Sequence, residues 1–68
     1  MKPITRFCIR PKGQTEYASI MEVDGHIPNL SKDFPVQIRG CHYWVRFVET
    51  IFTEDGYIMQ FVALKTNE

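Results

Sequence analysis

Two cysteines and two histidines are the side chains of this sequence with the most distinctive chemistry. Cys8, His26, Cys41 and His42 together have the composition of a Cys2His2 metal site. Structural zinc sites, however, present their ligands in close pairs such as C-x2-C. Cys41 and His42 are adjacent, so on a strand they point to opposite faces. We therefore predict no metal site, and interpret the pair as a buried thiol beside an exposed imidazole.

Covalent catalysis would require a cysteine or serine beside a histidine and an orienting acid. The sequence has no G-x-S-x-G motif and no glycine-rich loop leading into a helix. A chain of 68 residues also has little room for a substrate cavity, which usually occupies on the order of several hundred Å³. We expect no enzymatic activity, no catalytic residue and no cofactor.

Aromatic and basic residues suggest binding instead. His42, Trp44 and Arg46 alternate along one segment and would share a face of a strand. Arg6 and Arg10 would share a face of an earlier strand. If the two strands were neighbours, their aromatic and basic side chains would stack bases and neutralise phosphates. The formal net charge of zero argues against a strong polyanion binder.

A protein partner is the leading expectation. The C-terminal part of the chain carries more apolar side chains than one small core should use, and such an excess is typical of interfaces. Tyrosine, tryptophan and arginine are enriched at interface hot spots. The alternative is that both apolar faces are internal to a closed barrel and its covering loop. The candidate binding residues are Arg6, Arg10, His42, Tyr43, Trp44, Arg46 and Tyr57.

Length and charge define the wider setting. We expect residues 1–68 to form one small domain without a membrane span or a secretory signal, and hence a cytoplasmic protein. In that compartment the cysteines would be free thiols, although neighbouring strands would also permit a disulfide. Basic residues gather near the start and acidic residues near the end. This distribution suits self-association, and we expect a homodimer.

The elements that position these residues are predicted to be strands. Residues 41–53 and 57–64 are rich in β-branched and aromatic types, and the short segment between them contains Gly56, so they predict a hairpin. Residues 4–10 predict an N-terminal strand. Residues 16–23 fit strand spacing better than helix spacing, and Asp24-Gly25 predicts a turn with a return at Ile27.

The alternation of apolar and polar residues changes phase at Gly40. Apolar residues occupy even positions in residues 34–39, whereas Cys41, Tyr43, Val45 and Phe47 form the better core set afterwards. A β-bulge or a sharp corner at Gly40 would produce this change.

The sequence thus predicts an all-β fold, a five-stranded antiparallel barrel or strongly curved sheet of the SH3-like or OB-like kind. The fold would be α+β if residues 16–23 were helical. In its compactness and lack of motifs the chain resembles small accessory proteins of phages and plasmids, which implies a regulatory binding module. Its expected partner is a protein, and the alternative is a nucleic acid bound by an aromatic and basic face.

Overall fold

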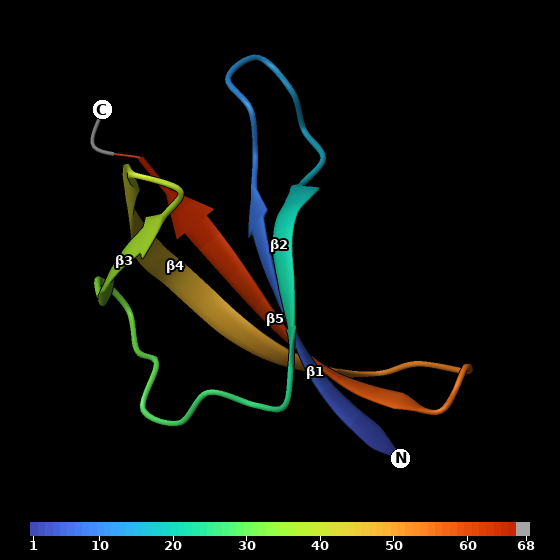
Figure 1. The fold of residues 1–68 in the computed structure, drawn as a ribbon. Coiled ribbons are helices and arrows are strands. Elements are labelled where there is room, and N and C mark those ends of the chain that lie inside the picture. Colours follow the sequence, from blue (N-terminus) through green and yellow to red (C-terminus); the bar gives the residue numbers. More distant parts are fainter. Residues whose placement is uncertain (67–68) are drawn as a thin grey trace.

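Five β-strands and no helix make up the computed structural model, which describes residues 1–66 (Figure 1). The all-β prediction is therefore confirmed, and the ambiguous segment contains a strand. Among the described residues, no helix is long and apolar enough to cross a membrane. The strands are β1 (Lys2–Ile9), β2 (Ala18–Asp24), β3 (Pro35–Ile38), β4 (Cys41–Phe52) and β5 (Tyr57–Lys65).

The strands form one sheet in the order β2-β1-β5-β4-β3, which curves until it is nearly closed into a barrel (Figure 1). Three of the strand pairs are antiparallel, as expected. The pairing of β1 with β5 is parallel, so the prediction of an entirely antiparallel sheet is wrong for this pair. Its two strands are distant in sequence, and no tight turn fixes their relative direction.

The phase change at Gly40 arises from a two-residue hairpin turn. Ile38 pairs with Cys41, and the intervening Arg39 and Gly40 have φ values of 52° and 81°. Two consecutive positive φ values are characteristic of the type I′ turn, whose twist matches that of the flanking strands. The expected sharp corner is therefore this turn.

A β-bulge does occur, but it lies further along, in β4. Val45 pairs with Leu64 and Phe47 pairs with Ala63, so Arg46 is the additional residue. Because of the bulge, Val45 and Phe47 point to opposite faces of the sheet although they are two residues apart. Val45 is fully buried, whereas Phe47 is 41% exposed. The prediction that Phe47 would continue the core set of Tyr43 and Val45 is therefore wrong.

The interior of the curved sheet holds the hydrophobic core. Its buried cluster draws on four of the five strands, and half-buried side chains of β2 and of the loop 25–34 pack against it. β5 runs through the centre, and Val62 and Leu64 are almost completely inaccessible to solvent. The cluster consists of Phe7, Ile38, Val45, Val62 and Leu64.

A buried polar network holds the loop 25–34 against the sheet. The Gln60 side chain accepts a hydrogen bond from the Ile27 N–H and donates one to the Ile27 carbonyl, both at 2.9 Å. The buried Thr5 hydroxyl lies 2.6 Å from the Gly25 carbonyl oxygen and 2.9 Å from Gln60 Oε1, and its single proton serves one of them at a time. The return strand that was expected at Ile27 is therefore a loop. The Gln60 side chain of β5 takes the place of a neighbouring strand, because it hydrogen-bonds both the N–H and the carbonyl of Ile27.

Replacing Gln60 with leucine should lower the free energy of unfolding by about 2–3 kcal/mol, because both backbone groups of Ile27 lose their partner near the core. Chemical denaturation measures this change. The matched control is Gln37→Leu, at an exposed position of β3, which should change stability by less than about 0.5 kcal/mol. Equal losses in the two variants would show that the Gln60 hydrogen bonds do not stabilise the loop.

The hairpin turn offers a stabilising substitution. Arg39 adopts a positive φ at a cost that asparagine largely avoids, so Arg39→Asn should raise the free energy of unfolding by up to about 1 kcal/mol. Gly40→Ala should lower it by about 1 kcal/mol through backbone strain alone, since an added Cβ would meet nothing within 4 Å. Thermal unfolding of both variants tests the assignment, and a destabilised Arg39→Asn protein would contradict it.

Candidate binding surfaces

The sheet surface that points away from the core is mainly apolar, but Arg6 of β1 and Glu49 of β4 flank Phe61 of β5 in its middle row. Ile4 and Cys8 of β1 lie opposite Met59 and Ala63 of β5, and all four are buried. Side chains alternate along a strand, so these residues point away from the core that the intervening residues fill. Residues of β4 extend the same surface. We call it the outer face and define it by Ile4, Cys8, Phe47, Ile51, Met59, Phe61 and Ala63.

Three rings form an aromatic cluster on the outer face. Tyr17 reaches it from the loop between β1 and β2 and meets Phe47 and Phe61 edge-on, with centroid distances of 6.1 and 5.6 Å. The centroids of Phe47 and Phe61 are 6.1 Å apart. The Arg10 guanidinium lies 6.0 Å from the centre of the Tyr17 ring, at the limit of a cation–π contact. A basic side chain therefore adjoins the cluster.

The predicted binding residues of β4 are distributed over several environments. His42 is exposed and Trp44 is half-buried, and the register places them opposite Gln37 and Pro35 of β3. Tyr43 points the other way and packs against the core. Burial raises the pKa of the Tyr43 hydroxyl, and the neighbouring Cys41 thiol raises it further.

Arg6 and Tyr57 lie apart from the other candidates. Arg6 is paired with Glu22 of β2, with 2.7 Å between Nη2 and the carboxylate oxygen. The Tyr57 N–H donates a hydrogen bond of 3.1 Å to Thr53 Oγ1, which helps to close the turn before β5. In the parallel pair, Tyr57 begins β5 whereas Arg10 follows the end of β1. The two residues therefore mark opposite ends of the sheet.

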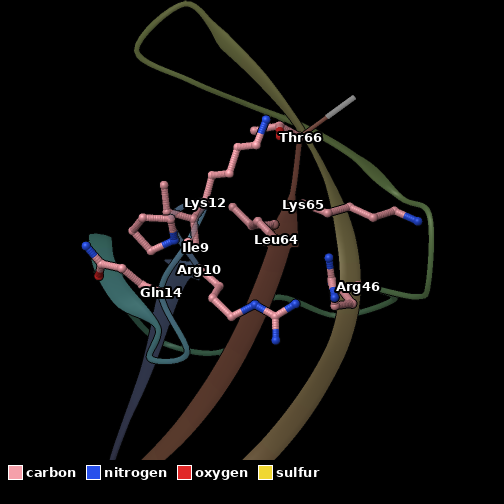
Figure 2. A pocket seen from close by; sticks show the side chains of 10 residues that line it. Ile9, Arg10, Lys12, Gln14, Arg46, Leu64, Lys65 and Thr66 are labelled. Atoms are coloured by element: carbon pink, nitrogen blue, oxygen red, sulfur yellow. The ribbon is translucent and has the colours of Figure 1, made fainter. Parts of the chain in front are cut away.

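Arg10 and Arg46, by contrast, are brought to one pocket with a volume of about 610 Å³ (Figure 2). It lies at the carboxyl ends of β1 and β5, which meet because these strands are parallel. Lys12 and Lys65 also line it, and no carboxylate of the described residues does. Lys65 points away from Arg10 in Figure 2 and pairs with Asp33 at 2.9 Å. This pairing holds the pKa of Asp33 below its usual range.

The two thiols are free, and they differ in accessibility. Cys8 is buried on the outer face, whereas Cys41 is exposed beside the β3–β4 turn. The expectation of a buried thiol at Cys41 is therefore wrong, because Cys41 directly follows the two-residue turn, at the exposed turn end of the hairpin. Among residues 1–66, no three histidine, cysteine or acidic side chains gather in a metal-binding arrangement.

Several residues of these surfaces were not identified from the sequence. Tyr17 gave only an ambiguous helix or strand spacing, and Phe47 had the spacing of a core residue. Phe61 belongs to the predicted hairpin, but its contact with Tyr17 is a tertiary one. Nothing in the sequence around Lys12 and Lys65 indicated that they would line a pocket. The sequence identified both arginines of the pocket but not the register that brings them together.

Comparison of the chain with protein-family models, curated proteins and solved structures gave no significant match.

The two thiols should react with iodoacetamide at different rates. Cys8 is only 3% exposed, and burial raises the pKa of its thiol against the opposing effect of Arg6. It therefore has little reactive thiolate. At about pH 8, peptide mass spectrometry should find Cys41 modified first and Cys8 protected until denaturant is added. Equal rates in the native protein would contradict the burial of Cys8.

Proposed function

We propose that this chain is a non-enzymatic binding module that acts through protein contacts, and that a second copy of the chain covers its outer face. The observation that carries the proposal is the apolar character of the sheet on the side opposite the core. Phe47 remains 41% exposed there and contacts two other rings. A small accessory or regulatory protein would use such a surface for assembly.

The chemistry of the outer face suits a protein partner. Large aromatic side chains at the centre of a patch supply much of the binding free energy in protein interfaces. Around the apolar residues lie charges that are already paired within the chain, namely Arg6 with Glu22 and Lys2 with Asp24. A formal net charge of zero does not oppose self-association. Glu49, opposite Phe61, has no ion pair among the described residues, so a dimer contact would leave it at the solvated rim.

The accessible part of the outer face is centred on Phe47, because Ile4, Cys8, Met59 and Ala63 are already buried within the chain, so a dimer contact would extend to neighbouring residues. A stable interface typically buries about 800 Å² on each partner. The described chain exposes 4896 Å² in total, so a standard interface would cover roughly a sixth of it. The outer face runs over β1, β5 and β4, the three adjacent inner strands of the sheet. A two-fold arrangement would place the same residues on both sides of the contact.

Replacing Phe47 with glutamate should weaken dimerisation by at least about tenfold, because it puts an unpaired charge into an apolar contact. Sedimentation equilibrium measures the dissociation constant, and circular dichroism checks that the variant is folded. The expected result is a dimer for the unmodified chain and a monomer for Phe47→Glu at the same micromolar concentration.

Phe52→Glu is the matched control. Phe52 is 68% exposed, on the same strand, but is outside the outer face. This variant should dimerise like the unmodified chain. A monomeric unmodified protein at millimolar concentration would refute self-association, and equal weakening in both variants would refute the assignment to the outer face.

A further inference from the structure

We infer that the pocket at the carboxyl ends of β1 and β5 is an anion site that takes the phosphate of a nucleotide, either free or at the end of a single-stranded oligonucleotide. The site adjoins the proposed dimer contact, because Arg10 lines the pocket and also lies beside the Tyr17 ring, but anion binding does not require the dimer. The inference begins with the distribution of charge. The chain has eight lysines and arginines, and four of them line this one pocket.

The pocket also holds most of the cations that the fold leaves without an ion pair. Within residues 1–66, ion pairs engage Lys2, Arg6 and Lys65. Arg10, Lys12 and Arg46 have no carboxylate within ion-pair distance in the described part of the chain, and all three line the pocket. In Figure 2 the Arg10 guanidinium extends toward Arg46, whereas Lys12 is directed toward Thr66. Like charges that face each other without a counter-charge repel one another. A bound anion would relieve this repulsion.

Two local features of the backbone hold these cations in place. Arg46 is the additional residue of the β4 bulge, which aims its side chain toward the pocket. Lys12 belongs to a turn closed by a 3.0 Å hydrogen bond from the Gln14 N–H to the Pro11 carbonyl. Figure 2 shows the Arg10 side chain extending across β5 toward Arg46. The bulge and the turn thus fix the backbone positions from which these side chains reach the pocket.

The groups and dimensions of the pocket favour a nucleotide. Guanidinium groups bind phosphate through two parallel hydrogen bonds, and two of the cations are arginines. A volume of about 610 Å³ exceeds the space that a lone phosphate needs and falls in the usual range for small-molecule sites. Ile9, Pro11 and Leu64 supply an apolar wall for a sugar or a base.

Isothermal titration calorimetry of the full chain with adenosine monophosphate, inorganic phosphate and a 5′-phosphorylated oligothymidylate tests the inference. We expect the nucleotide to bind more tightly than inorganic phosphate. Arg46→Gln and Lys12→Gln should each weaken nucleotide binding roughly tenfold, because each removes a charge-assisted contact. Affinity should also fall as salt rises. Tighter binding of the oligonucleotide would identify a nucleic-acid end as the source of the phosphate, and equal binding would identify the free nucleotide.

The matched control is Lys32→Gln, which removes an exposed cation outside the pocket and should leave affinity unchanged. Amide NMR spectra check that each variant is folded, and in the unmodified chain nucleotide should shift the signals of residues 9–14 and 64–66. No binding below millimolar concentration, or equal loss in Lys32→Gln, would overturn the site. Equal affinity for inorganic phosphate would overturn the nucleotide assignment. Sedimentation equilibrium of Arg46→Gln and Lys12→Gln measures their dimerisation separately, so this test can fail independently of the dimer test.

Discussion

The parallel pairing of β1 with β5 is the contact on which the rest of this molecule depends. It joins residues near the two ends of the described chain, from Lys2 beside Tyr57 to Ile9 beside Leu64. It also makes β5 a central strand, with the antiparallel β4 on its other side. Both edges of β5 are therefore hydrogen-bonded, and its side chains alternate between the core, with Val62 and Leu64, and the outer face, with Met59 and Ala63. Without this pairing, β1–β2 would be an isolated two-stranded ribbon, which is marginally stable at best, and β3–β5 would lose Phe7 from its core cluster.

The same pairing produces both candidate surfaces. Alternation along β1 and β5 sends Phe7 and Val62 to the core, and sends Cys8 and Ala63 to the outer face. The parallel direction then brings the ends of the two strands together, where the basic pocket forms. The parallel pairing of β1 with β5 therefore positions both the outer face and the basic pocket. The bulge in β4 serves both, since it exposes Phe47 and turns Arg46 toward the pocket.

The charged and buried polar side chains of this protein are concentrated at particular places in the fold, which the overall composition does not reveal. A formal net charge of zero conceals a pocket lined by four cations without a carboxylate from the described residues. The buried polar network is equally local: Thr5 and Gln60 satisfy the backbone of one loop and leave no buried side-chain atom of the described residues without a partner. Such satisfied polar groups fix a unique arrangement, whereas Arg10, Lys12 and Arg46 have no carboxylate partner within residues 1–66.

The sequence by itself determined the elements. The alternation of residues 41–53 and 57–64 and the glycines between apolar segments predict strands and turns, because these signals depend on neighbouring residues alone. It also identified Arg10 and Arg46 as binding candidates. Only the tertiary structure decided the direction of β1 beside β5, the position of the bulge and the contact of Tyr17 with Phe47. These features depend on which distant segments bury each other's apolar surface, and that free energy is a property of the assembled core rather than of any local pattern.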